Sequence, residues 1–348
     1  MTNASLRRID ETRKVQITGG STYIFSLPKR WAVQNQLKKG TSLRVQEEDD
    51  GSLSIMPSGL EKHEKTNEAL IKCFPEERPE AVTRKVVSAY LVGYNFLRVR
   101  TQAPELSSIL RNHLKVFARR FLVGTEIVTD TSVELSLQVL LNYQELPVES
   151  ALRRMAIIAA SMHRDALAAF ARNDRRLAET VVETDSEVDR FNLYIIRQLK
   201  SAIANPKLIK AVGLSSARDC LGYRLVTKSI ERAADHAVKI AESSLILKQK
   251  MEPKHLRRVE EMSSLSVSMF EESIESLFRK EFGLAESVIE KTEKVIDLES
   301  GVLGSLQKTG FEELTAVRLL LESVRRTAEY ASDIAEIVLN MNIDSILG

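Results

Sequence analysis

From Pro147 onward the sequence contains no strand-like segment and shows the apolar spacing of helices throughout. Glycine and proline are sparse in this part of the chain, and they mark the places where helices should end. The expected interruptions are Asn205-Pro206, Gly213, Pro253, Gly283 and Gly310. This pattern predicts six long helices in two groups of three, so most of the chain is constrained to a mainly α fold of helical bundles.

The two groups of helices are copies of each other. The segment LAETVVE at 177–183 recurs as LAESVIE at 284–290, and RAADHAVKIAE at 232–242 recurs as RTAEYASDIAE at 326–336. Upstream residues recur at the same offset as the first of these segments: Met162, Leu167 and Arg172 return as Met269, Ile274 and Arg279. Residues 147–246 and 253–343 are therefore predicted to be a duplicated three-helix unit.

In the first copy, two helices each carry a pair of acidic residues four positions apart. Asp185 and Asp189 belong to the second helix, and Glu231 and Asp235 belong to the third. Because residues four apart share one helical face, antiparallel packing of the two helices can bring all four carboxylates together. Such a cluster is unfavourable unless a cation neutralises it, and iron, manganese, magnesium and zinc are all conceivable.

The same acidic residues also have a simpler interpretation as an ordinary charged helix face. Glu231 would then pair with Arg232 or Lys228. Asp235 would pair with Lys239. Ion pairs of this kind contribute little stability, and they require no metal.

The second copy keeps only part of the acidic pattern. Its matching acids on the second helix are Glu293 and Asp297, after a slip of one residue. On the third helix Glu329 replaces the second acid, and Arg325 replaces the first. A positive charge at that position opposes the binding of a cation. Glu329 and Asp333 form a further acidic pair, which either restores a site in a shifted register or faces water.

Two of these acidic segments resemble motifs of the PhoU family of phosphate-uptake regulators. ERAADHAVKIAE (231–242) is similar to the third-helix motif of that family, and DSEVDRF (185–191) to its second-helix motif. The resemblance covers residues 147–343 and implies two tandem three-helix bundles whose acidic motifs carry multinuclear iron or other metal clusters. It implies Asp185, Asp189, Glu231 and Asp235 as metal ligands, and, less securely because of Arg325, also Glu293, Asp297 and Glu329.

The N-terminal part of the chain has a different character. Alternating apolar and polar residues predict four short strands, in the segments RKVQIT (13–18), TYIFSL (22–27), TSLRVQ (41–46) and SLSIMP (52–57). GGS (19–21) and DDGS (49–52) are turn sequences that join them into two hairpins, with a helix expected over 28–40 between the hairpins. So small a unit cannot close a good core alone, and dimerisation is the expected remedy.

This N-terminal segment, with its SLPK and LKKG motifs, is similar to AbrB-like (SpoVT-AbrB) swapped-hairpin domains. In that family two chains interleave their hairpins into one barrel that binds DNA. The basic residues expected to contact DNA are Arg7, Arg8, Arg13, Lys14, Lys29, Arg30, Lys38 and Lys39. The alternative is a solvated hairpin domain that only dimerises. An AbrB-like domain followed by two PhoU repeats resembles the archaeal type of PhoU regulator.

Residues between these two regions mix helices and strands. The pattern predicts helices over 79–93 and 106–121, strands over 95–101 and 124–130, and an apolar segment over 133–141. This resembles a small α/β module. The phosphate-binding loops GxxxxGK[ST] and GxGxxG are both absent from it. The expected domains are thus an AbrB-like domain at 1–58, the module at 59–146, and PhoU-like repeats at 147–250 and 251–348.

Composition excludes several classes of protein. Lys plus Arg (50) nearly balance Asp plus Glu (48), so the formal charge of +2 does not indicate a wholly basic nucleic-acid binder. The two cysteines match no CxxC spacing, and the apolar runs fall short of a membrane span. We expect a cytoplasmic protein without membrane insertion. It has no arrangement of nucleophile and base, and no Glu-x-x-His spacing of a carboxylate-bridged metal enzyme, so it is not expected to be an enzyme.

These observations favour a regulator of phosphate uptake and phosphate homeostasis. It would be a homodimer or higher oligomer, with metal-binding helical repeats and an N-terminal domain that contacts DNA as a transcriptional regulator. A phosphate-transporter ATPase or a sensor protein is a conceivable partner. The alternative is an adaptor that dimerises through its N-terminal domain, never binds DNA, and modulates a transporter ATPase or channel.

Overall fold

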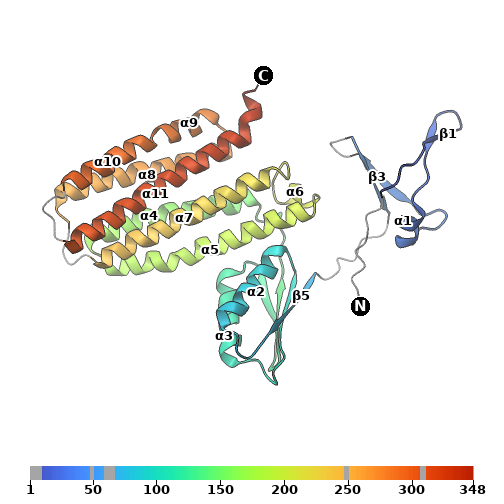
Figure 1. Cartoon of the computed structure of the whole chain (residues 1–348), viewed down its shortest axis with the longest axis horizontal. Helices are drawn as coiled ribbons and strands as arrows, with labels where there is room; N and C mark the ends of the chain where they lie inside the picture. The colour runs from blue at the N-terminus through green and yellow to red at the C-terminus, as the bar shows by residue number, and fades with distance from the viewer. Residues whose placement is uncertain (1–9, 48–50, 59–66, 247–250, 306–310, 348) are drawn as a thin grey trace. The chain divides into compact units, whose positions relative to one another are not determined.

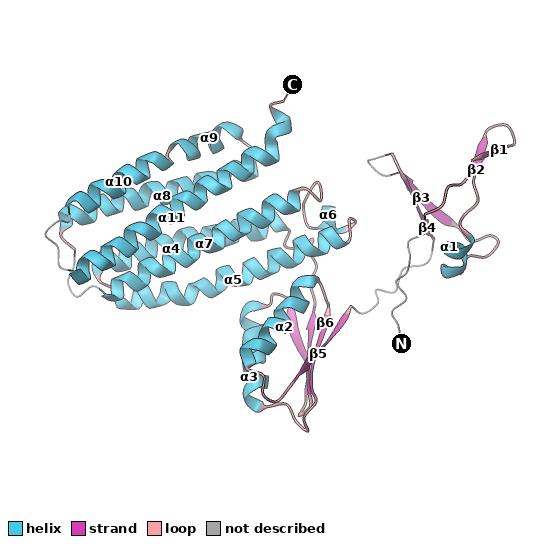
Figure 2. Cartoon of the chain, in the orientation of Figure 1, coloured by secondary structure: helices cyan, strands magenta, loops and turns pink. Residues whose placement is uncertain are grey.

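The computed structural model describes residues 10–47, 51–58, 67–246, 251–305 and 311–347. The chain divides into two compact units, residues 1–66 and 67–348, and each is described by itself. The larger unit contains an α/β module and a long helical region (Figure 1; Figure 2). None of the helices in the described ranges combines the length and the apolar character needed to cross a membrane.

The smaller unit consists of two hairpins and one short helix, as predicted. Its elements are β1 (Gln16–Thr18), β2 (Thr22–Ile24), α1 (Lys29–Gln34), β3 (Leu43–Glu47) and β4 (Leu53–Pro57). The β1–β2 turn places Gly19 and Gly20 at positive φ, which glycine adopts without strain. The helix is shorter than the predicted range 28–40, because the chain turns left-handed at Gln36.

No residue is fully buried in the described part of this smaller unit. Apolar side chains from both hairpins and the helix remain open to solvent; Ile17 is 63% exposed, Tyr23 72% and Val33 67%. Apolar surface on this scale normally marks an interaction site. The observation agrees with the expectation that so short a segment cannot close a core by itself.

The α/β module has a four-stranded sheet with two helices on one face (Figure 2). Its elements are β5 (Glu68–Cys73), α2 (Pro79–Val92), β6 (Phe96–Thr101), α3 (Ser108–Phe121), β7 (Thr125–Asp130) and β8 (Glu134–Val139). The strand order is β5-β6-β8-β7, with β5 and β6 parallel and the other pairs antiparallel. The sequence pattern identified both helices and placed β8 in its apolar segment, but it missed β5.

The helical region contains two groups of helices. The first group is α4 (Val148–Arg172), α5 (Arg175–Ala204), the short α6 (Leu208–Ala211) and α7 (Asp219–Ile246). The second is α8 (Pro253–Arg279), α9 (Phe282–Glu290), α10 (Thr292–Ser305) and α11 (Phe311–Asn342), followed by a 3-10 turn at Ile343–Ser345. The first group contains three long helices, as predicted. In the second, the middle helix is divided at Lys291.

The observed helix ends match some of the predicted interruptions. The chain leaves α5 just before Pro206, and α8 begins at Pro253. Gly283 does not interrupt a helix, because it lies inside α9; the turn is made by Lys280, which is left-handed at φ 55°. Asn173 makes the equivalent turn in the first copy, at φ 53°. Gly310 lies outside the residues that the structure describes.

One continuous apolar core joins the two groups of helices. Residues at equivalent positions of the two copies meet across it. The rings of His236 on α7 and Tyr330 on α11 lie 5.7 Å apart, and Arg164 on α4 pairs with Glu271 on α8. Contacts between equivalent positions are what a two-fold arrangement of two similar bodies produces. The duplicated units therefore pack about a pseudo-two-fold axis.

Candidate functional site

The four predicted acidic ligands of the first bundle lie on two helices that pack against each other, α5 and α7 (Figure 1). Asp185, Asp189 and Glu231 are half-buried, and Asp235 is exposed. Burial, followed by repulsion from the other three carboxylates, raises the pKa of Asp185 to about 6. Burial and repulsion from Glu231 and Asp235 raise the pKa of Asp189 to about 6 as well. The four carboxylates therefore lie close enough for the charge of each to act on the others.

The positive charges described near the carboxylate cluster belong to α7 itself: Lys228, Arg232 and Lys239 all act on Asp235. Lys228, one turn before Glu231 on α7, forms an ion pair with it, as the simpler interpretation of this face anticipated. Lys228 does not neutralise the cluster, because burial and the charge of Glu231 still raise the pKa of Asp235. Arg232 lies over the ring of Tyr330, with its guanidinium carbon 5.9 Å from the ring centroid.

A cation fits this donor set chemically, because four carboxylates with one lysine at the edge leave negative charge to neutralise. Hard divalent cations prefer such oxygen ligands. The side chains are not drawn together into a finished chelate, however. Within the described ranges, no three histidine, cysteine or acidic side chains are grouped closely enough to hold a metal ion.

The corresponding region of the second bundle is organised differently. The Arg325 side chain lies between two carboxylates, with its Nε 3.1 Å from Glu299 on α10 and an ion pair to Glu329 on α11. Arg326 also pairs with Glu329, at 2.9 Å. The predicted ligands Glu293 and Asp297 are both exposed. The acid that faces Glu329 is therefore Glu299, which the sequence interpretation missed.

A signal for Glu299 was present in the sequence. It stands four residues after Val295 and three before Val302, and both valines are fully buried. Apolar spacing of this kind places the residue between them on the inner face of the helix. Burial raises the pKa of Glu299 even though Arg325 opposes the shift.

A buried arginine joins the α/β module to the first bundle. Arg197 on α5 is 1% exposed. Its guanidinium donates hydrogen bonds to the carbonyl oxygens of Tyr90, Gly93 and Tyr94 at the end of α2, and to Asn95 Oδ1 at 2.7 Å. Among the described residues no carboxylate pairs with it. The negative end of the α2 dipole therefore balances its charge.

The sequence interpretation did not identify this contact, because an isolated arginine on a helix is normally exposed. Arg120, at the end of α3, makes a weaker contact by donating to the carbonyl oxygen of Glu183 at 3.4 Å. Leu193 packs against the core of the module. The helix that carries Asp185 and Asp189 is thus also the helix on which the module is fixed.

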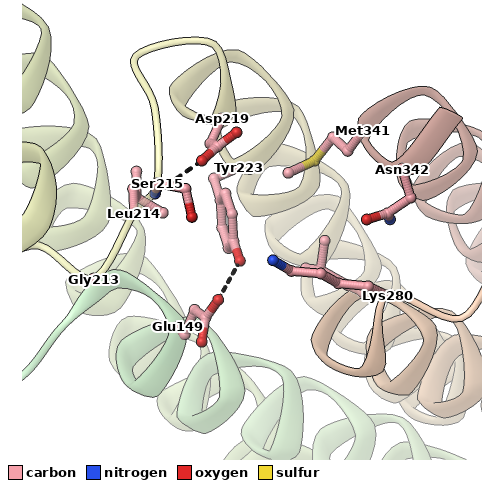
Figure 3. Close-up of a pocket in the computed structure, with 10 residues that line it drawn as sticks. Glu149, Gly213, Leu214, Ser215, Asp219, Tyr223, Lys280, Met341 and Asn342 are labelled. Atoms are coloured by element: carbon pink, nitrogen blue, oxygen red, sulfur yellow. Dashed lines mark hydrogen bonds between the residues drawn. The ribbon is translucent and has the colours of Figure 1, made fainter. Parts of the chain in front are cut away.

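A cavity of about 90 Å³ lies between the ends of α4, α7, α8 and α11 (Figure 3). Tyr223 donates a hydrogen bond to Glu149 at 2.7 Å, and Asp219 accepts from the backbone amides of Ser215 and Ser216. Lys280 extends into the same space (Figure 3). Glu149 and Asp219 are both engaged in hydrogen bonds that hold α7 and the chain leading into it, so this cavity is a polar contact region between the bundles.

The predicted DNA-contacting residues that the structure describes all lie on the surface of the smaller unit. They are Arg13, Lys14, Lys29, Arg30, Lys38 and Lys39, and every one is exposed. Arg13 forms an ion pair with Glu11. Arg7 and Arg8 lie outside the described residues. The smaller unit therefore exposes both basic and apolar side chains to solvent.

Comparisons with known proteins cover both ends of the chain. The family model of the PhoU domain matches residues 152–244 and 259–338. The family model "Antidote-toxin recognition MazE, bacterial antitoxin" matches residues 16–63. No curated protein shows a significant match to the chain.

Solved structures of PhoU proteins are similar to the helical region. The crystal structure of PhoU from Pseudomonas aeruginosa shares 22% identity over 57% of this chain and 96% of its own, with a TM-score of 0.51. The phosphate transport system regulatory protein PhoU from Streptococcus pneumoniae shares 19% identity over 58% of this chain and 96% of its own, with a TM-score of 0.49. At 22% identity the first of these likenesses shows the fold of the helical region.

The position of the matched segments agrees with the duplication read from the sequence, since each falls within one copy. The PhoU family is regulatory, which agrees with the prediction that the chain is not an enzyme. The chain is therefore a PhoU-domain protein with two PhoU repeats and an N-terminal domain of the MazE/AbrB type.

Proposed function

We propose that this protein is a DNA-binding regulator of phosphate uptake and phosphate homeostasis whose first bundle binds a metal cation. The observation that carries the metal part of the proposal is the mutual charge repulsion that Asp185 and Asp189 share with Glu231 and Asp235 in one copy of the duplicated unit, and the DNA part rests on the exposed basic side chains of the N-terminal unit. The matches to the PhoU domain and to MazE support the two halves of this proposal.

A bound cation would neutralise the carboxylate cluster and hold α5 against α7. Asp185 and Asp189 would approach it from α5, and Glu231 and Asp235 from α7. Lys228 would compete with the cation for Glu231, because its ammonium group already donates a hydrogen bond to that carboxylate. Iron, manganese, magnesium and zinc all remain candidates, since oxygen ligands of this type accept each of them.

Elemental analysis of the purified protein tests the metal proposal. We expect the wild-type protein to carry more metal than an Asp185→Ala/Glu231→Ala variant. Glu187→Ala/Glu242→Ala is the matched control, because it removes two exposed acids of the same helices outside the cluster. Equal metal content in the wild type and the first variant would contradict the proposal.

The DNA proposal rests on charge and on the uncovered apolar side chains of the smaller unit. A dimer would cover apolar residues such as Ile17 and Val33, and it would double the number of basic side chains on one compact body. Lys29 and Arg30 begin α1 and are both exposed. Contacts of such residues with phosphates release counterions, so binding should weaken steeply as salt increases.

A band-shift titration on promoter DNA of the organism's own phosphate-transport genes tests this. We expect a shift at low salt that is lost at high salt and is weakened in Lys29→Ala/Arg30→Ala. Lys254→Ala/Arg257→Ala, on the exposed face of α8, is the control for net charge. If the wild-type protein gives no shift at low salt, the adaptor that modulates a transporter ATPase or channel becomes the better account.

A further inference from the structure

The α/β module contains a cavity of about 570 Å³ that none of the functions above uses. It lies where the parallel strands β5 and β6 end, so Cys73 and Thr101, the last residues of these strands, both line it. The carboxyl edge of parallel strands is where α/β sheets bind ligands. Its volume falls within the range of about 300–1,000 Å³ found for small-molecule sites.

Donors without a protein acceptor lie on one side of this cavity, where α3 begins. The N-cap residue Ser107 makes no side-chain capping bond, and no acidic residue occurs in the first turn. Across the described ranges, the backbone amides of Ser108 and Ile109 have no hydrogen-bond acceptor. Amides at a helix N-terminus favour a carboxylate or another anion.

Carboxylates lie on the same rim, and no lysine or arginine side chain lines the cavity. Glu77 is already neutralised, because it pairs with Lys85 and accepts the amide of Phe74 at 3.1 Å. Glu105 is exposed, and no side chain in the part of the chain described forms an ion pair with it. A simple anion would therefore meet an unpaired carboxylate, and a simple amine would leave the α3 amides unused.

The remaining wall of the cavity is apolar. Leu106 and Leu110 are buried beneath it, whereas Phe74 is 43% exposed and Ile109 72% exposed at its edge. A ligand with an apolar group would cover these side chains and gain the free energy of removing them from water.

We infer that this cavity binds a free amino acid with an apolar side chain. The carboxylate of the ligand accepts hydrogen bonds from the amides of Ser108 and Ile109, and its ammonium group pairs with Glu105. The apolar side chain lies against Phe74. A zwitterion satisfies the donors and the acceptor on this rim together, which neither a simple anion nor a simple amine does.

Isothermal titration of the full chain with L-leucine, L-isoleucine, L-valine, L-methionine and L-phenylalanine tests the inference. We expect saturable binding of at least one of them. For that amino acid, the analogue lacking the amine and the analogue lacking the carboxylate should each bind at least about ten-fold more weakly. For leucine these analogues are 4-methylpentanoate and 3-methylbutylamine.

Two variants test the placement of the ligand. Ser108→Pro removes one amide donor at a position where a helix tolerates proline, and Ser107 before it already has the extended φ −48°, ψ 131° that proline requires. Glu105→Gln removes the carboxylate. Both should weaken binding at least about ten-fold, whereas Glu126→Gln, on the exposed face of β7, should not.

The outcomes separate clearly. No saturable binding of any of the five amino acids at concentrations up to about 10 mM overturns the inference. Binding that is equally tight for an analogue lacking the amine or the carboxylate overturns it as well. Binding that is unchanged in both Ser108→Pro and Glu105→Gln, with folding confirmed by circular dichroism, shows that the amino acid binds elsewhere and also overturns it.

Discussion

The two helical bundles are copies in their packing, but they differ in the source of the positive charge near their acidic residues. In the first bundle, burial and repulsion between the carboxylates raise the pKa values of Asp185 and Asp189, and Lys228 pairs only with Glu231 at the edge of the cluster. In the second, Arg325 lies between Glu299 and Glu329 and pairs with both. The second bundle thus has a fixed positive charge between its acidic residues, whereas in the first the paired lysine lies at the edge of the cluster.

The bundles also differ in what is attached to them. Arg197 on α5 fixes the α/β module to the first bundle, and among the described residues no second module is present on the other copy. The comparison indicates that duplication preserved the apolar core, while the charged residues on α5 and its counterpart diverged. The first bundle is therefore the copy that carries both the carboxylate cluster and the module.

The largest effect expected on the first bundle comes from Arg197. Arg197→Met should lower the free energy of unfolding by about 3–4 kcal/mol, because the carbonyl oxygens of Tyr90, Gly93 and Tyr94 at the end of α2 would lose a charged donor in a buried place. Chemical denaturation of the full chain followed by circular dichroism measures this loss. Lys200→Met, one turn further along α5 and exposed, is the matched control.

A loss below about 1 kcal/mol for Arg197→Met, similar to that of an exposed site, would contradict the idea that this side chain holds the module on α5. It would also weaken the contrast between the bundles, because the module would then be attached mainly by apolar contacts such as that of Leu193.

The next largest effect concerns the internal cation of the second bundle. Arg325→Met should cost about 2–3 kcal/mol, since the mostly buried Glu299 would lose its cation and Glu329 would keep only Arg326. Lys228→Met in the first bundle should cost at most about 1 kcal/mol, because that lysine is 38% exposed and pairs at the edge of the cluster. Denaturation of both variants in the same buffer makes the comparison direct, and equal losses would remove the distinction between an internal and an edge cation.

Part of this picture could be predicted from the sequence. The duplication and the facing acidic pairs follow from local periodicity, since residues four apart share a face wherever the helix packs. Glu299 and Arg197 were missed for different reasons. Glu299 was missed because the copies were compared only at the positions of Asp185 and Asp189, whereas Glu299 matches Asn192 at the same offset, although Val295 and Val302 marked its face. The role of Arg197 could not be predicted from the sequence, because its partners are backbone oxygens at the end of α2, more than a hundred positions away.

The missed strand β5 also depends on contacts that are distant in the sequence. The six residues Glu68–Cys73 show weak alternation, and their strand is defined by parallel pairing with β6. Such pairing depends on tertiary contacts more than on propensity.

Gly283 was expected to end a helix, yet glycine is tolerated within the first turn of α9. The turn between the helices falls at Lys280, as it does at Asn173 in the first copy.

A third prediction uses a position where the copies differ inside the core. His163 on α4 is 2% exposed, and its counterpart at the same offset is Phe270 on α8. Burial, with smaller effects from Arg164 and His236, lowers the pKa of His163 to about 4. Between pH 4 and 6.5 the unfolded chain therefore binds a proton that the folded chain excludes, and the stability of the protein falls as pH is lowered through this window.

His163→Phe should remove about 2 kcal/mol of this pH-dependent loss between pH 6.5 and 4. The measurement is the difference in unfolding free energy between variant and wild type at several pH values, so that other titrating groups cancel. The reciprocal change Phe270→His should add a similar dependence to the second bundle. A difference that stays constant over this pH range would show that His163 already binds its proton in the folded protein.

The smallest expected effect is also the most direct test of the comparison. Glu231→Arg gives the first bundle the residue that the second bundle has at the equivalent position, Arg325. The new guanidinium should neutralise part of the charge of Asp189 and Asp235, and raise the stability of the metal-free protein by about 1 kcal/mol. It should also abolish any rise in melting temperature on addition of manganese or magnesium, because a fixed positive charge then occupies the place of the cation. Glu242→Arg, on the exposed face of α7 and outside the cluster, makes the same change in net charge and should keep the wild-type response. If Glu231→Arg responds to the cation as the wild type does, the two bundles do not differ in the way their charges suggest, and the cation binds away from these carboxylates.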